Sequence, residues 1–144
     1  MTQHPLHWQL DHVGIAVRDL EKSIQMYSQA TSMSVTLRET LPSQGVELAF
    51  LNTGAAKIEL LAPLNYPAST TLARFLDSRG PGLHHICYRV SDIHSELKKL
   101  QGHGCKLIDS SPRPGAGGTL IAFLHPSSFE GVLTELCQYP VSAT

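Results

Sequence analysis

The chain has 144 residues, of which 42% are hydrophobic and 16% are charged, and its formal net charge at pH 7 is −1. These values fit one globular domain with a substantial core, and they provide no basic surface for nucleic acid or an anionic membrane. We expect no membrane span, because no run of about 18 apolar residues is present, and a cytoplasmic setting, because residues 1–8 lack the features of a secretory signal and three scattered cysteines predict no disulfide framework.

The first 62 residues predict a strand, a helix and three further strands. Residues 10–17 alternate and are rich in Val and Ile, as in a half-buried strand. Asp19 is a typical N-cap, and apolar residues at near-helical spacing extend the helix to about Ala30. Three strands follow, of which the last two are joined by a Gly-containing hairpin turn; they are predicted at 34–38, 46–52 and 57–61.

The second half predicts the same order of elements after a linker at 63–81, which contains a short helix over Thr70–Ser78. The loop at 110–118 is too rich in Gly and Pro to be regular. The remaining elements are a strand at 84–90, a helix at 92–102, and strands at 105–108, 119–125 and 132–138.

The two halves also repeat one another in sequence. Residues 10–20 align with residues 83–93 at an offset of 73, and a later pair of Glu residues aligns at an offset of 76. Each half therefore has a His at the start of its first strand and a Glu in its last strand. The aligned pairs are His12 with His85 and Glu59 with Glu135.

This duplication predicts an α+β fold of two βαβββ modules related by a pseudo-twofold. Their curled mixed sheets would enclose a metal cleft, with the helices on the outer faces. Module one covers about residues 8–62 and module two about residues 82–140, and we expect both in a single domain of residues 1–144.

Strand alternation predicts which side chains face the cleft, because every second residue shares a face. His12, Gly14 and a following Ala lie on one face of the first strand, and the bulkier set belongs under the helix. His85 aligns with His12, whereas His84 aligns with Asp11 on the opposite face. We therefore expect His85 to be a ligand and His84 to support it or lie at an edge.

The residues His12, Glu59, His85 and Glu135 form the candidate metal set. Two imidazoles and two carboxylates suit one divalent ion among Co²⁺, Ni²⁺, Mn²⁺, Zn²⁺ and Mg²⁺. Such an ion would keep two neighbouring positions open for a substrate with two adjacent oxygens, and would act as a Lewis acid. A single His is often structural and a strand Glu often faces solvent, so these interpretations stay open for each residue taken alone.

At these positions the chain resembles the vicinal-oxygen-chelate (glyoxalase/bleomycin resistance/dioxygenase) superfamily, and within it the methylmalonyl-CoA epimerases. The resemblance spans residues 8–140, and its Gly-Leu-His-His-Ile and Phe-Leu-His-Pro motifs are more specific than the first-strand His. The matching segments are Leu10–Val17, Lys57–Leu64, Gly82–Ile93, Phe123–Ser128 and Gly131–Leu136.

The resemblance implies interconversion of (R)- and (S)-methylmalonyl-CoA, an acyl-CoA thioester, through a metal-stabilised enolate. It also implies a homodimer. Inversion needs acid/base groups on both faces of the substrate carbon. By this likeness, Glu135 serves as one of them and Glu47 is a candidate for the other, although a solvent-facing Glu47 is an equal alternative. The chain departs from many epimerase-like sequences in having Gly115–Gly118 where they carry a loop His.

Other functions of the same fold remain open. A glyoxalase I-type lactoylglutathione lyase would use the same ligand set, so the four metal residues do not separate it from an epimerase. An extradiol dioxygenase would need only one carboxylate, which Glu59 argues against. A metal-free small-molecule binding protein would lack the ligands altogether.

Overall fold

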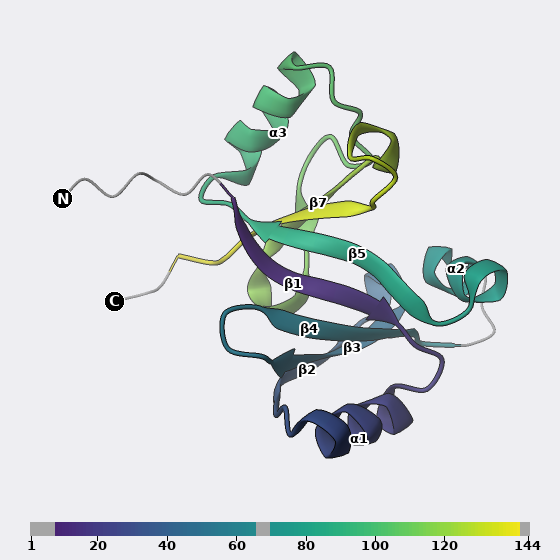
Figure 1. The fold of residues 1–144 in the computed structure, drawn as a ribbon. Coiled ribbons are helices and arrows are strands. Elements are labelled where there is room, and N and C mark those ends of the chain that lie inside the picture. The colour runs from purple at the N-terminus through teal and green to yellow at the C-terminus, as the bar shows by residue number, and fades with distance from the viewer. Residues whose placement is uncertain (1–7, 66–69, 142–144) are drawn as a thin grey trace. The chain divides into compact units, whose positions relative to one another are not determined.

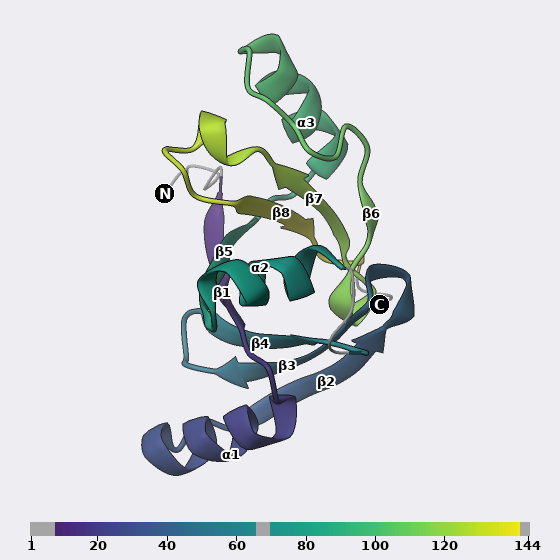
Figure 2. The ribbon, with the colours of Figure 1, turned by 90° about the vertical axis from the view of Figure 1, so that its right-hand side faces the viewer.

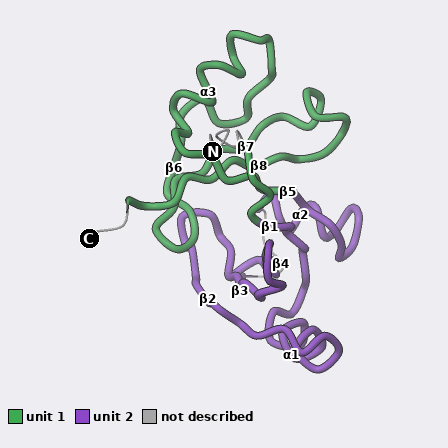
Figure 3. Tube along the Cα trace, turned by 60° about the vertical axis from the view of Figure 1, so that its left-hand side comes forward, with its two compact units in different colours: residues 1–11, 86–144 green, residues 12–85 purple. Residues whose placement is uncertain are grey.

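The computed structural model describes residues 8–65 and 70–141. Three short segments lie outside the described residues. They are residues 1–7, at which we expect no secretory signal, residues 66–69 of the predicted linker, and residues 142–144 at the end of the predicted single domain. The chain divides into two compact units, coloured in Figure 3. Unit 2 comprises residues 12–85, and the described part of unit 1 comprises residues 8–11 and 86–141.

The unit boundaries fall inside two strands, β1 (Gln9–Ala16) and β5 (Gly82–Arg89). Pairing of β1 with β4 begins at His12, and pairing of β5 with β8 begins at Ile86. Both unit boundaries therefore fall where the first strand of a module begins to pair with the last strand of that module. The units follow the two predicted modules apart from these few residues and the linker, whose described residues belong to unit 2.

Unit 2 contains a mixed four-stranded sheet in the order β2-β3-β4-β1. The strand β1 runs parallel to β4, and the other neighbours are antiparallel. A short 3-10 turn (Pro42–Gln44) joins β2 to β3. The remaining elements are α1 (Leu20–Thr31), β2 (Val35–Leu41), β3 (Val46–Asn52), β4 (Lys57–Pro63) and α2 (Thr71–Arg79).

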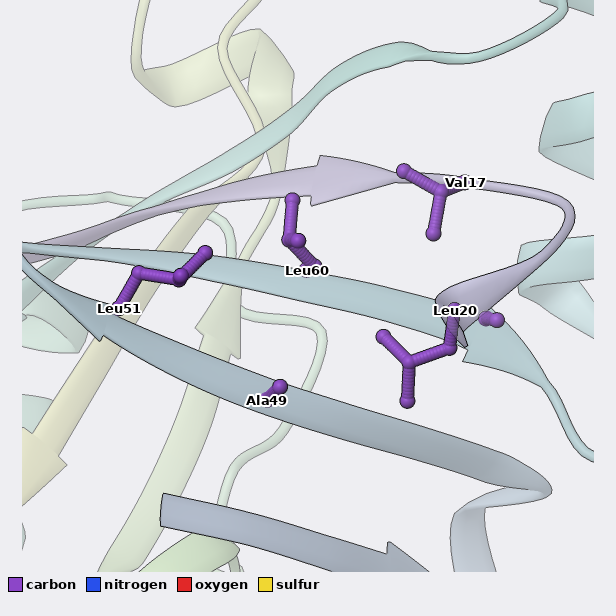
Figure 4. Packing of buried hydrophobic residues seen from close by; sticks show 6 residues of the cluster. Val17, Leu20, Ala49, Leu51 and Leu60 are labelled. Atoms are coloured by element: carbon purple, nitrogen blue, oxygen red, sulfur yellow. The ribbon is translucent and has the colours of Figure 1, made fainter. Parts of the chain in front are cut away.

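Apolar side chains from β1, β3, β4 and the start of α1 form the core of unit 2 (Figure 4). The helix begins at its predicted N-cap, where the carboxylate of Asp19 accepts a hydrogen bond from Lys22 N at 3.1 Å. This cap directs α1 along β3 and β4, which it covers. The buried members of this core are Val17, Leu20, Ala49, Leu51, Leu60 and Ala62.

Unit 1 repeats this plan with the strand order β5-β8-β7-β6 (Figures 1 and 2). The strand β5 is parallel to β8, and α3 packs against β7 and β8. Asp92 caps α3 by accepting from Ser95 N at 3.2 Å. The remaining elements are α3 (Ile93–Gly102), β6 (Arg113–Pro114), β7 (Leu120–Leu124), β8 (Thr134–Gln138), and 3-10 turns at Ala116–Gly118 and Pro126–Ser128.

The structure confirms the α+β class and the two βαβββ modules with mixed sheets, but it corrects the second strand of module two. Residues 105–108 form only an isolated bridge, Leu107 to Leu124. The chain crosses β7 there, because Ile108 N and Asp109 N both donate to the carbonyl of Phe123 at 3.0 Å. The strand at this place is β6, inside the segment 110–118 that composition had predicted to be irregular.

No helix among the described residues is long and apolar enough to span a membrane.

Candidate metal centre

The first strand presents its two faces as the alternation predicts. His12, Gly14 and Ala16 are buried on one face, whereas Ile15 and Val17 pack into the core beneath α1. In the parallel register of β1 and β4, Gly14 lies opposite Glu59. The carboxylate of Glu59 therefore shares the face of His12.

Gly14 makes room for an imidazole. A Cβ atom at this position would lie 2.2 Å from Cε1 and 2.4 Å from Nδ1 of His85, well inside contact distance. The close approach of β1 to this ring therefore requires a residue without a side chain. Strand alternation correctly predicted that Gly14 shares the face of His12. The contact with His85 was not predictable, because the two residues lie far apart in the sequence.

Three of the four predicted ligands converge within unit 2. His12 Nε2 lies 3.5 Å from Glu59 Oε1, His85 Nε2 lies 3.2 Å from the same oxygen, and the two Nε2 atoms are 3.3 Å apart. All three residues are at least nine-tenths buried, with exposed fractions of 4–6%. The three donor atoms thus form a nearly equilateral triangle in an environment with little water.

This triangle fits a divalent ion. Metal bonds to imidazole and carboxylate are about 2.0–2.2 Å long, and the corners of a triangle with such sides are about 1.9 Å from its centre. His12, Glu59 and His85 could thus all hold one ion at bonding distance. The donor set of two nitrogens and one oxygen suits borderline divalent ions.

The electrostatics of Glu59 favour the ionised carboxylate that a metal requires. Burial alone would raise the pKa of Glu59, but the hydrogen bonds and charges of His12 and His85 outweigh this effect and lower the pKa below its ordinary value of 4.5. Phe50, which pairs with Glu59 in the antiparallel register, also packs its ring against His12 with centroids 5.0 Å apart. The cluster therefore has an apolar wall.

His84 contacts the other side of the second ligand. Its Nδ1 lies 2.9 Å from Nδ1 of His85, and its ring packs edge-on against Phe75 of α2 with centroids 4.9 Å apart. His85 therefore directs Nε2 towards Glu59 and His12, and Nδ1 towards His84. His84 therefore lies against the ring of His85, the residue that we expected it either to support or to flank at an edge.

Glu135 belongs to unit 1, where it is 5% exposed in β8. In the parallel register of β5 and β8 it lies opposite Cys87. A buried carboxylate is stable only when it is paired, hydrogen-bonded or bound to a metal. Its burial removes the alternative that Glu135 is a strand residue facing solvent.

Glu47 lies on the other face of the sheet of unit 2. In the register of β3 and β4 it is opposite Ala62, a residue of the core beneath α1, whereas Phe50 is opposite Glu59. Residues 47 and 50 therefore point to opposite faces. The register turns Glu47 away from the metal triangle, so we do not retain it as the second acid/base group.

The family of the chain follows from comparison with known proteins. A model described as the Glyoxalase/Bleomycin resistance protein/Dioxygenase superfamily matches residues 11–123. The chain belongs to this superfamily. The match begins within β1 and ends within β7, and it agrees with the fold and with the resemblance found in the sequence.

Several similar members of the superfamily are epimerases. The ethylmalonyl-CoA/methylmalonyl-CoA epimerase of Cereibacter sphaeroides is 39% identical over 131 residues, covering 90% of this chain and 96% of that protein. The crystal structure of methylmalonyl-CoA epimerase from Mycobacterium tuberculosis matches with a TM-score of 0.88 and 38% identity, covering 98% of this chain and 94% of that chain.

Two further members bear on the substrate. A methylmalonyl-CoA epimerase in complex with methylmalonyl-CoA and NH4+ matches with a TM-score of 0.87 and 30% identity, covering 94% of this chain and 96% of that one. A probable lactoylglutathione lyase of Synechocystis is 30% identical over 127 residues, covering 88% of this chain and 92% of that protein. The lactoylglutathione lyase of Synechocystis is therefore less similar in sequence to this chain than the epimerase of C. sphaeroides.

Proposed function

We propose that this protein is an epimerase that interconverts the (R) and (S) forms of methylmalonyl-CoA. The observation that carries the proposal is the buried triangle of His12, Glu59 and His85 in a chain whose superfamily relatives include methylmalonyl-CoA epimerases at 38–39% identity. The triangle supplies the donors for a divalent ion, and the relatives indicate which substrate such a site serves.

We assign Glu135 as the fourth ligand, an assignment supported by the internal repeat. In β1, His12 precedes by two residues the position that faces Glu59. In β5, His85 precedes by two residues Cys87, the position that faces Glu135. The same register therefore relates each His to the Glu of its own module. Since His12 and Glu59 lie 3.5 Å apart, equal geometry in module two would bring Glu135 to His85.

The ion, one of Co²⁺, Ni²⁺, Mn²⁺, Zn²⁺ and Mg²⁺, supplies Lewis-acid stabilisation of the negative charge that develops on the thioester when C2 loses its proton. The protein residues do the rest. His12, His85 and Glu59 hold the ion in a site with little water, which strengthens this effect. Glu135 exchanges the proton at C2 on one face of the substrate.

Inversion at C2 also requires a proton donor on the opposite face. Glu47 does not fit this role because its strand register directs it towards the helix-covered face. The second proton donor is therefore another polar group of the protein or a bound water.

Deuterium exchange tests the proposal. Protein incubated with (S)-methylmalonyl-CoA in D2O should incorporate one deuterium at C2 and form the (R) isomer, and removal of the metal by a chelator should abolish both. Glu135→Gln should lower exchange at least 100-fold, whereas the matched variant Glu47→Gln should retain it. Turnover of the hemithioacetal of methylglyoxal and glutathione without exchange at C2 would instead identify a lactoylglutathione lyase. Ligand binding with neither reaction, in protein without metal, would identify a binding protein.

We further propose a cytoplasmic homodimer. All three cysteines are free thiols, which is typical of a reducing compartment. Exposed apolar side chains, among them Leu83 in β5 with 72% exposure, offer apolar surface for a second copy. Light scattering during size-exclusion chromatography should give about twice the 15.7 kDa mass of the chain, and a monomeric mass would contradict the proposal.

A further inference from the structure

A second cluster of metal-ligating side chains lies in unit 1. It consists of Asp11 in β1, Cys87 in β5 and Cys137 in β8, and one ligand atom of each lies within 4.8 Å of those of the other two. None of the three belongs to the ligand set assigned above. Neither thiol forms a disulfide.

Strand register brings the two thiols together. Cys137 is opposite Arg89 and Cys87 is opposite Glu135 in the parallel pair β5–β8, so the two cysteines are diagonal neighbours on one face. Cys87 is fully buried and Cys137 is 2% exposed, and both pack against Ile121. The pair is therefore held by two adjacent strands rather than by loops.

The carboxylate of the cluster is also held in place. The hydroxyl of Tyr139 donates to Oδ1 of Asp11 at 2.5 Å. The guanidinium of Arg89 stacks over the ring of Tyr139 at 3.9 Å from its centroid, which fixes that ring in turn. Asp11 is half-buried, whereas the two thiols are buried. Solvent therefore reaches the cluster at the carboxylate and not at the sulfur atoms.

We propose that Asp11, Cys87 and Cys137 form a second cation site, selective for a thiophilic ion such as Zn²⁺. Thiolates select zinc, cadmium and copper(I) over magnesium and manganese. Zinc–sulfur bonds of about 2.3 Å in a tetrahedron place two sulfurs about 3.8 Å apart, a separation that the 4.8 Å limit of the cluster accommodates. Water entering beside Asp11 completes the four ligands.

The two thiols have a simpler explanation as small apolar residues of the core. Burial, followed by the hydrogen bond with Cys137 and the charge of Glu135, raises the pKa of Cys87 far above its usual range. The proton of the Cys87 thiol must therefore leave when an ion binds. A purely structural pair would bind no cation at micromolar concentration, and this difference makes the proposal testable.

Cadmium is the probe, because thiolate-to-cadmium charge transfer absorbs in the ultraviolet and the His and Glu centre contains no sulfur. Titration of the whole protein should produce this absorption with a stoichiometry of one Cd²⁺ per chain. The His12→Ala variant should keep the band, since it alters only the other centre. Cys87→Ala and Cys137→Ala should each lower the affinity at least 100-fold, whereas the matched variant Cys105→Ala should bind like the parent protein.

X-ray absorption of cadmium in the unaltered protein needs no variant and guards against misfolding. Two sulfur neighbours at a common distance are expected at one equivalent of cadmium. The absence of sulfur neighbours, or a charge-transfer band that disappears only in Cys105→Ala, would overturn the proposal. Because the readout is sulfur ligation, failure of the proposed epimerase activity would leave this result unaffected.

Discussion

Gly14→Ala isolates the contact on which the metal triangle depends. The added Cβ would lie 2.2 Å from Cε1 of His85, and ordinary carbon contacts are about 3.5 Å, so the imidazole must move by about 1.3 Å. Gly14 has no positive φ and lies within β1, so alanine is compatible with the backbone itself. The whole effect should therefore come from displacement of the ring.

Displacement of this size is large for a metal ligand. Metal–ligand distances in working sites agree with their ideal values within about 0.2 Å, whereas the ring of His85 must shift several times as far. We expect the affinity for Co²⁺ or Mn²⁺ to fall at least 100-fold, which corresponds to about 2.7 kcal/mol. Overpacking should also reduce the free energy of unfolding by about 1–3 kcal/mol.

Calorimetric titration of the apoprotein with Co²⁺ checks the expectation, at a temperature at which circular dichroism shows that the variant is folded. Gly102→Ala is the matched control, because a Cβ at this last residue of α3 would meet no atom within 4 Å. It should change neither affinity nor fold. If Gly14→Ala binds cobalt within threefold of the parent protein, the close contact between Gly14 and His85 is not part of the metal site.

Three other outcomes follow from the same geometry. His85→Ala should abolish metal retention during dialysis and His84→Ala should not, as measured by elemental analysis; the reverse would refute the assignment of faces in β5. The pKa of Glu59 is lower in the folded chain than its ordinary value of 4.5. The ionised carboxylate therefore stabilises the fold fully above pH 4.5, and this stabilisation is lost as the pH falls through the pKa of the folded state. In denaturant titrations of chelator-treated protein, Glu59→Gln should thus lose less stability than the parent between about pH 5 and 3. Leu60→Ala, at a fully buried core position, should cost about 2–5 kcal/mol of unfolding free energy, whereas Met26→Ala, at a 53% exposed position of α1, should stay within about 0.5 kcal/mol.

Local signals made much of this fold predictable. Asp19 and Asp92 were predicted to begin helices, and both cap the first turn through their own carboxylates. N-caps act within three residues of chain, so sequence reports them directly. The face of His12 was also predictable, since alternation along one strand needs no knowledge of its neighbours.

Features that depend on partners distant in sequence were not predictable. The second strand of module two was misplaced because its path is set by the carbonyl of Phe123 and by Asp109, whose carboxylate accepts from Phe123 N at 2.9 Å. The face of Glu47 depends on its register with Ala62 in β4, and a one-residue shift reverses it. The sequence therefore left both alternatives for Glu47 open, an acid/base group in the cleft and a residue facing solvent.

The repeat explains why the two modules use equivalent positions differently. Gly14 and Cys87 each lie two residues after a His and opposite a Glu of the parallel partner strand. At the first position the imidazole of His85 occupies the space of a side chain, so only glycine fits. At the second, packing against Ile121 requires only a small apolar residue, which alanine would satisfy equally well. The thiol of Cys87 has Cys137 as its diagonal neighbour and the carboxylate of Asp11 nearby. Together these three groups form the donor set that we propose for zinc. If Cys87 serves packing alone, bound cadmium should have no sulfur neighbours. Two sulfur neighbours would mean that Cys87 is a cation ligand, whereas Gly14 at the equivalent position of module one only leaves space for the ring of His85.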